Sequence, residues 1–269
     1  MSSATRSGAP TAAPAHPVGR RGTPPPGTAS TLSPDPFGGP PLGAVRTFHP
    51  RRGRLSPQQR DAIDRLAPAY AVPVDGAPLD LTALFGNDRP VVLEIGFGMG
   101  EATAAMAEAA PGVNILATDI HTPGIGNLLH LIETRQLANV RIAEGDAVVL
   151  LTDMLAAGAL AGIRVYFPDP WPKSRHHKRR LIRPGFTALA ASRLAPGGTL
   201  HCATDWAPYA AWMLDVLEAE PALANAAGPG GGYVPRPDWR PMTRFEQQGL
   251  AKGHSVADLI FTKTAPNAS

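Results

Sequence analysis

Five acidic side chains lie at the ends of apolar, strand-like runs along this chain: Glu94, Asp119, Asp146, Asp169 and Asp205. In an open α/β sheet the carboxyl ends of parallel strands meet at one edge, and ligands bind in the crevice there. A single acid at such a position often only caps the following helix, and capping explains any one of them about as well as ligand binding does. Five in a row favour a binding site.

The segment Val165–Arg180 combines one of these acids with a dense group of cations. It reads Val-Tyr-Phe-Pro-Asp-Pro-Trp-Pro-Lys-Ser-Arg-His-His-Lys-Arg-Arg. Prolines at three alternate positions cannot continue a central strand or a helix interior, so they predict a stiff turn around Asp169. Cation runs are usually solvated surface, but no acid balances this one, which favours a polyanionic ligand. The cation run extends from Trp171 to Arg183, and its cations are Lys173, Arg175, Lys178, Arg179, Arg180 and Arg183.

A glycine-rich turn follows the first apolar run and contains Gly96, Gly98 and Gly100. Glycines let the backbone turn sharply and approach a ligand closely, although tight packing of a strand on a helix explains them equally well. The dinucleotide fingerprint needs a third small residue where this chain has Glu101, which disfavours NAD. An acid before the glycines, Glu94, instead suits a cationic ligand such as S-adenosylmethionine.

The elements that position these residues alternate regularly. Strands are predicted at Val91–Ile95, Asn114–Thr118, Val140–Ala143, Ile163–Phe167 and Thr199–Ala203, and helices at Glu101–Ala110, Gly126–Arg135, Val148–Ala157, Phe186–Leu194 and Tyr209–Glu220. This alternation predicts an α/β fold with a mostly parallel, doubly wound sheet. Two late segments, Met242–Glu246 and Val256–Lys263, are predicted to pair antiparallel at the sheet edge. Together with the acids, the pattern indicates a class I (Rossmann-like) methyltransferase core.

Composition divides the chain into three parts. Residues 1–44 form a tail rich in Pro, Gly and Ala that is predicted to be disordered, because it cannot bury enough apolar surface to order itself. Residues 45–88 carry Arg46, Arg51, Arg52 and Arg54 and a helix capped by Ser56; these arginines fit a solvated entry segment and a second anion-contacting patch equally well. Residues 89–266 form the predicted methyltransferase domain.

Net charge and cysteine content indicate which ligands and which cellular compartment suit the protein. The formal net charge is only +3, so affinity for nucleic acid has to come from local clusters. The single cysteine, Cys202, lies in an apolar run and is predicted to be a buried structural thiol. With no apolar run long enough to span a membrane and no signal-peptide pattern, we expect a soluble, cytoplasmic protein.

Three motifs resemble those of the bacterial tRNA (guanine-N7-)-methyltransferases. They are Leu93–Gly100, Phe167–Arg180 and Thr243–Gly249, in that order, and the resemblance covers roughly residues 45–264. Small departures are Asp119 where the family often has Glu, Pro172 where other residues occur, and Arg244 for a common Lys.

The resemblance implies S-adenosyl-L-methionine as cofactor, tRNA as partner, and 7-methylguanosine at position 46 of the variable loop as product. It places the cofactor at Glu94, Gly96, Gly98, Gly100, Asp119, Asp146 and Asp169, with Asp169 as the catalytic residue. It places the substrate at Lys173, Asp205, Thr243, Arg244, Phe245 and Glu246, and the RNA-contacting run at Arg175, His176, His177, Lys178, Arg179 and Arg180.

The chemistry agrees with these roles. Guanine N7 carries no proton, so methylation needs alignment rather than a general base, and Asp169 is predicted to stabilise the positive charge that develops on the ring. Asp205 and Glu246 are hypothesised to accept hydrogen bonds from guanine N1–H and the 2-amino group, which adenine lacks as a pair. Trp171 is interpreted as a core anchor rather than a base-stacking residue.

Other functions fit the sequence less well. A methyltransferase for another RNA or for a small molecule, an RNA-binding module without catalysis, and a nicotinamide oxidoreductase are the alternatives, in falling order. The basic run argues against a small-molecule substrate, and the acids at the cofactor positions argue against a purely binding role. No metal is implied, because the histidines lack ligand spacing. Nothing in the sequence implies a membrane or an obligate protein partner.

Overall fold

The computed structural model describes Leu42, Thr47 and residues 53–228, 230–251, 253 and 255–265. The predicted tail, apart from Leu42, and the arginines at 46, 51 and 52 therefore lie outside the described residues. Within residues 45–88 the predicted helix is confirmed as α1 (Pro57–Tyr70). Ser56 begins it with a capping box: its hydroxyl accepts from the Gln59 amide, and the Gln59 side chain accepts from the Ser56 amide.

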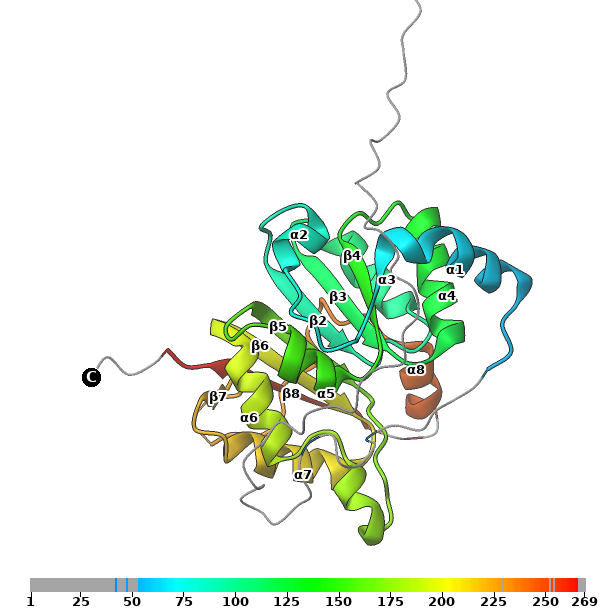
Figure 1. Ribbon diagram of the computed structural model, residues 1–269. Coiled ribbons are helices and arrows are strands. Elements are labelled where there is room, and N and C mark those ends of the chain that lie inside the picture. Colours follow the sequence, from blue (N-terminus) through cyan, green and yellow to red (C-terminus); the bar gives the residue numbers. More distant parts are fainter. Residues whose placement is uncertain are drawn as a thin grey trace, which may run out of the picture. The chain divides into compact units, whose positions relative to one another are not determined.

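The described chain forms an eight-stranded sheet. Its strands are β1 (Ala71–Pro73), β2 (Val91–Ile95), β3 (Asn114–Asp119), β4 (Val140–Glu144), β5 (Leu160–Tyr166), β6 (Leu194–Thr204), β7 (Leu223–Asn225) and β8 (Ala257–Lys263). They lie in the order β1-β4-β3-β2-β5-β6-β8-β7 (Figure 1). Strands β1 to β6 pair in parallel, and β8 pairs antiparallel with both β6 and β7. The predicted fold class is confirmed. The antiparallel C-terminal strand is β8, and the short strand β7 pairs with it at the edge of the sheet.

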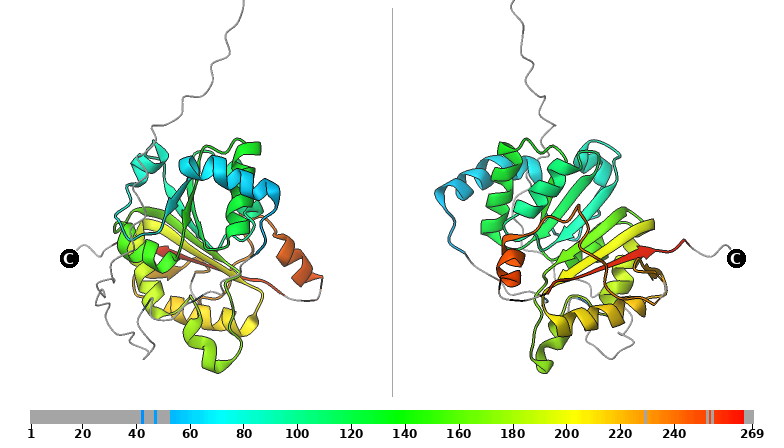
Figure 2. Two further views of the ribbon diagram at one scale, coloured as in Figure 1. Left: turned by 45° about the vertical axis from the view of Figure 1, so that its right-hand side comes forward. Right: turned by 180° about the vertical axis from the view of Figure 1, so that it is seen from behind.

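Helices cover both faces of the sheet (Figure 2). One face packs against α1, α3 (Glu101–Ala109) and α4 (Thr122–Thr134). The other packs against the π-helical turn η1 (Leu150–Met154), which continues the short helix α5 (Ala147–Val149), and against α6 (Pro184–Arg193) and α7 (Ala207–Glu218). The short helix α2 (Leu81–Phe85) adds Phe85 to the second of these cores, whereas the 3-10 helix η2 (Ser174–Arg179) and α8 (Arg244–Leu250) lie outside both.

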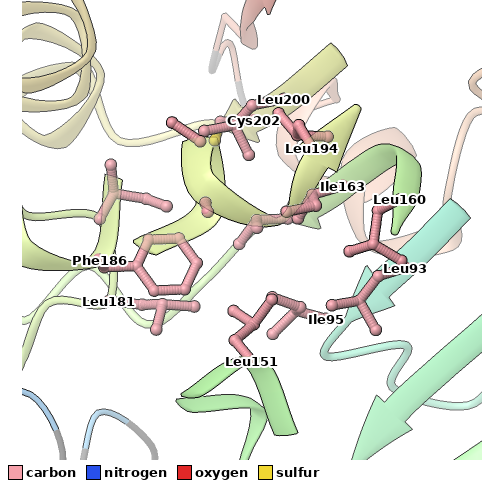
Figure 3. Packing of buried hydrophobic residues seen from close by; sticks show 14 of the residues in the cluster. Leu93, Ile95, Leu151, Leu160, Ile163, Leu181, Phe186, Leu194, Leu200 and Cys202 are labelled. Carbon is pink, nitrogen blue, oxygen red and sulfur yellow. The ribbon is translucent and has the colours of Figure 1, made fainter. Parts of the chain in front are cut away.

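The larger core lies between strands β2, β5 and β6 and the second helical layer (Figure 3). Leu93, Ile163 and Leu200 from the three strands pack here with Phe186 of α6. Cys202 belongs to the same core and is fully buried, as predicted. Burial raises the pKa of its thiol to about 12, so the sulfur behaves as a small apolar group.

One predicted element is wrong. Met242–Glu246 was expected to be a strand but begins helix α8, because the Thr243 hydroxyl accepts a hydrogen bond from the Glu246 amide and caps the helix. The predicted strand Val256–Lys263 is confirmed as β8, which pairs with β6 rather than with residues 242–246. Among the described residues, no helix is long and apolar enough to cross a membrane.

Candidate active site

A cavity of about 260 Å³ lies at the carboxyl ends of the parallel strands. The strand order reverses between β2 and β5, which is where open α/β sheets bind ligands. Four of the predicted site acids and glycines line the cavity, together with part of the proline-rich turn. Its lining includes Gly96, Gly98, Asp119, Asp146, Tyr166, Phe167, Pro168 and Asp169.

The glycine-rich turn leaves room for a ligand at two positions. Gly96 and Gly98 have φ values of 78° and 60°, a region that side chains other than glycine rarely adopt. A Cβ atom at either position would meet no other atom within 4 Å. Because both residues line the cavity, their backbone faces open space there. Gly100, in contrast, begins α3 and packs against Leu128, so it serves the fold.

Asp119 and Asp146 each accept hydrogen bonds from nearby backbone amides and also line the cavity. The Asp119 carboxylate accepts from the Gly98 amide at 3.0 Å, and from the Ile120 and His121 amides at 2.7 and 2.9 Å. Asp146 caps α5 by accepting from the Val148 amide at 2.8 Å. Each carboxylate thus caps local backbone and also lines the cavity, so capping and ligand binding are not exclusive here.

Glu94 is the most unusual acid of the site. Its side chain lies in β2, next to the cavity-lining Ile95, and is only 3% exposed. Among the described residues, its Oε2 atom has no hydrogen-bond partner. Burial raises the pKa of Glu94 to about 7, although the Thr103 hydroxyl and the Arg164 guanidinium favour the ionised form. An unsatisfied buried carboxylate costs stability, so it indicates a group with a functional partner.

The turn that carries Asp169 is strained. Phe167 and Trp171, on either side of it, have φ values of 51° and 44°, which are uncommon for residues with a side chain. The Phe167 amide donates to Ala203 of the neighbouring strand at 2.8 Å, which ties the turn to the sheet. Trp171 is buried, as predicted for a core anchor. Strained backbone held by its surroundings is typical of functional sites.

The basic run divides into exposed and buried cations. Lys173, Arg175 and Lys178 are exposed, and His176, His177 and Arg179 are half-buried. Arg180 does not fit the expected RNA contact, because it is 3% exposed and donates to the Pro170 carbonyl at 3.0 Å. Its guanidinium also lies over the Tyr209 ring at 4.9 Å. Arg180 therefore holds the proline-rich turn against α7.

Part of the predicted substrate motif Thr243–Glu246 is buried and held by hydrogen bonds within the protein. Thr243 and Glu246 lie at the start of α8, whereas the side chains of Arg244 and Phe245 lie outside what the structure describes. Both carboxylate oxygens of Glu246 accept from Arg240, at 2.6 and 2.9 Å, and the pair is buried. The hypothesis that Glu246 reads the guanine edge is therefore less suitable than the same hypothesis for the half-buried Asp205, which follows β6.

Comparison with known proteins places this architecture in a family. Residues 88–259 match the family model described as "Putative methyltransferase". The tRNA (guanine-N(7)-)-methyltransferase of Streptomyces coelicolor is 63% identical over 220 residues, which cover 81% of this chain and 81% of that protein. The protein of the same name from Bordetella parapertussis is 55% identical over 219 residues, covering 81% and 85%. The chain belongs to the tRNA (guanine-N7-)-methyltransferase family.

Membership in this family confirms the resemblance seen in the three motifs. Among solved structures, the 16S rRNA methyltransferase KamB is 15% identical, with a TM-score of 0.47 over 65% of this chain and 88% of that chain. The fold assignment rests on the strand order. The methyl donor of the family is S-adenosylmethionine, and the residues of this tRNA (guanine-N7-)-methyltransferase family member fit it: a buried carboxylate at Glu94, one oxygen of which has no hydrogen-bond partner among the described residues, and open backbone at Gly96 and Gly98.

Sequence reasoning missed two groups of residues at the site. Tyr166 and Phe167 form part of the cavity wall, and their position directly before the predicted acid at a strand end could have indicated this. Arg240 was not singled out at all. Its only signal was its place three residues before the Thr243–Glu246 motif, because an arginine in a Pro-rich loop is usually exposed.

Proposed function

We propose that this protein methylates guanine N7 of tRNA at position 46 of the variable loop, and that it does so in the cytoplasm. The observation that carries the proposal is the cavity at the reversal of strand order, with Asp169 on its wall and exposed cations shortly after Asp169 in the chain. The family relatives bear the name of this reaction. The position in tRNA and the cellular setting go beyond what the relatives' names state.

We assign the cofactor to the acids and glycines around the cavity. Bound S-adenosylmethionine supplies an electrophilic methyl group on a sulfonium centre. Glu94 and Asp169 provide negative charge for its cationic part, and Asp119 and Asp146 offer carboxylate oxygens that accept from hydroxyl and amine groups. The backbone at Gly96 and Gly98 allows close approach without a side chain in the way.

Asp169 acts on charge and placement rather than on a proton. Guanine N7 has a lone pair and no hydrogen, so no base is needed to activate it. The ring becomes cationic as the new bond forms, and a carboxylate on the cavity wall stabilises that charge. The strained turn and the hydrogen bond from Phe167 to Ala203 hold Asp169 in place, so the site is organised before the base arrives.

Base selection is assigned to Asp205. Guanine offers a pair of donors, N1–H and the 2-amino group, to a carboxylate, and adenine does not. Asp205 directly follows β6, the neighbour of the strand that leads to Asp169. Glu246 is not assigned this role, because Arg240 already donates to both of its oxygens.

The exposed cations of the basic run are assigned to the tRNA backbone. Lys173, Arg175 and Lys178 project from η2 and the turn before it, on a chain whose net charge is only +3. Contacts between such side chains and phosphates strengthen binding and make it depend on salt. They fix the position of the tRNA without reading its sequence.

The test uses labelled S-adenosylmethionine and an unmodified tRNA transcript that has guanine at position 46. Methyl incorporation is followed by chemical cleavage at 7-methylguanosine, which locates the modified nucleotide. Asp169→Asn is compared with Asp153→Asn, an exposed acid on η1 outside the cavity. We expect one cleavage at position 46, no cleavage when that guanine is replaced by adenine, and strong loss of rate only in Asp169→Asn.

The outcomes separate the alternatives. Incorporation without cleavage would mean a different methylated atom, and cleavage elsewhere would refute position 46. Absence of incorporation, with retained tRNA binding, would support an RNA-binding module instead. Equal rates for the two asparagine variants would refute the role of Asp169.

A further inference from the structure

Arg240 is the largest fully buried side chain of the described chain. It makes four hydrogen bonds to two carboxylates. Its Nη1 and Nη2 atoms donate to the two oxygens of Glu246 at 2.6 and 2.9 Å. Its Nε and Nη2 atoms donate to the two oxygens of Asp258 at 2.7 and 2.8 Å. Because Glu246 belongs to α8 and Asp258 to β8, one guanidinium joins the late motif to the sheet.

The same cluster continues to the cavity wall. Asp258 accepts from His201 Nε2 at 2.8 Å, and His201 Nδ1 lies 2.9 Å from the Tyr166 hydroxyl. The Arg240 guanidinium carbon lies 5.8 Å from the ring centres of both Tyr166 and Phe167. These two aromatic residues line the cavity next to Asp169. Arg240 therefore packs against two residues of the cavity wall.

The charges of the cluster are arranged to hold it together. Burial lowers the pKa of His201 below its ordinary value in spite of Asp258, so the ring is neutral at pH 7. In that state Nε2–H donates to Asp258 and Nδ1 accepts from Tyr166. Burial opposes the charge of Arg240, but the hydrogen bonds to Glu246 and Asp258 outweigh it and raise its pKa. Two carboxylates share one guanidinium, and all three side chains are buried.

A buried cluster of ions contributes little net stability to a protein. Desolvation of buried ions consumes most of their attraction, and apolar residues of the same volume often stabilise a protein equally well. Buried ionic groups have a better-attested use in fixing one arrangement of the chain. Here the arrangement that is fixed is the position of Thr243–Glu246 relative to the cavity wall.

We propose that Arg240 is a positioning residue for the tRNA substrate: it holds the Thr243–Glu246 segment against the Tyr166–Phe167 wall. This inference rests on the proposed function and assigns to Arg240 and Glu246 a task within it. Among the described residues, no hydrogen bond or ion pair joins Arg240 to the cofactor residues Glu94, Asp119 and Asp146. Loss of Arg240 is therefore expected to affect the use of tRNA more strongly than the binding of the cofactor, whose cavity also includes Tyr166 and Phe167.

The experiment compares Arg240→Lys with Arg65→Lys. Lysine keeps the charge but cannot donate to two carboxylates in the planar arrangement of arginine. Arg65 is a matched control, because it also donates to both oxygens of one carboxylate, Glu133, at 2.7 and 3.0 Å, but is 48% exposed on α1. Titration calorimetry with S-adenosylhomocysteine measures cofactor-site affinity, and steady-state kinetics give kcat and KM for tRNA.

We expect kcat/KM for tRNA to fall about 100-fold in Arg240→Lys, as a displacement of about 1 Å does elsewhere. The affinity for S-adenosylhomocysteine should stay within about 2-fold, and Arg65→Lys should match the wild type in both measurements. Wild-type kcat/KM for Arg240→Lys would overturn the inference. So would a parallel loss of cofactor affinity, which indicates general damage to the fold.

A second variant keeps the test decisive where Arg240→Lys does not fold. Glu246→Gln preserves shape but removes the charge and replaces one of the two oxygens that accept from Arg240 with an NH2 group, so it should show the same selective loss of kcat/KM for tRNA, in smaller measure. In the double variant the losses should be less than additive, because both residues act through one contact. Additive losses would overturn the inference. An inactive wild type, by contrast, would refute the proposed function itself.

Discussion

The buried carboxyl of Glu94 makes the stability of the protein depend on pH in a way that one substitution removes. Glu94→Gln keeps the shape of the side chain but cannot ionise. Burial raises the pKa of Glu94 from its ordinary value of 4.5 to about 7. Between these two values the folded state binds more protons than the unfolded state, so stability falls as pH rises. The penalty is absent below about pH 4.5 and complete above about pH 7.

Its magnitude follows from the same two values. Each pH unit between 4.5 and about 7 contributes about 1.4 kcal/mol, which gives a total of about 3 kcal/mol. The variant should therefore match the wild type near pH 4.5, exceed it by about 2 kcal/mol at pH 6, and by about 3 kcal/mol at pH 8. Other titrating groups contribute equally to both proteins and cancel in the difference.

Urea denaturation of the cofactor-free proteins at pH 5, 6, 7 and 8 measures this difference in the free energy of unfolding. Glu144→Gln, at the exposed end of β4, is the control and should change stability by no more than about 0.5 kcal/mol at every pH. A difference for Glu94→Gln that stays constant from pH 5 to pH 8 would refute the reasoning. The same variant should bind S-adenosylmethionine more weakly, because its carboxylate charge is lost.

Three further predictions concern the basic run and the glycine turn. Replacing Arg175 and Lys178 together by alanine should weaken tRNA binding and reduce the slope of log affinity against log salt by about 2, measured by filter binding across a salt series. Arg180→Ala should instead leave that slope unchanged and lower the free energy of unfolding by about 2 kcal/mol, because a buried charged hydrogen bond is lost. Gly100→Ala should cost at least about 1 kcal/mol in urea denaturation, because its φ is 82° and a Cβ would lie 2.8 Å from Leu128 Cβ.

The fold was largely predictable, because the sequence repeats the same pattern of a short apolar strand followed by a helix. Five buried strands, each followed by a helix, restrict the topology to a parallel doubly wound sheet, and these strands are confirmed. The three-residue strands β1 and β7 were missed, since so short a run carries no period. Residues 242–246 have the composition of a strand, and only the capping hydrogen bond of Thr243 decides for a helix.

The site was predictable where position along the chain determines position in space. An acid that follows a buried parallel strand must lie at the carboxyl edge of the sheet, so Asp119, Asp146 and Asp169 were found and all line the cavity. Burial of a particular side chain is decided by tertiary packing instead. Arg180 and its neighbour Arg179 look alike in the sequence, yet only Arg180 is enclosed by α7.

Glu94 and Glu246 show what separates a ligand-binding acid from a structural one. Both are almost fully buried, at 3% and 2% exposure. Glu246 receives two hydrogen bonds from Arg240, so its charge is already compensated within the protein. Glu94 has an oxygen with no partner among the described residues and a pKa raised to about 7, so its charge is only partly compensated by Thr103 and Arg164. Buried acids of folded proteins normally have partners, as Glu246 does, so an incompletely partnered one indicates a ligand that supplies the missing contact. Glu94 lies next to the cavity, where a cationic ligand can supply it.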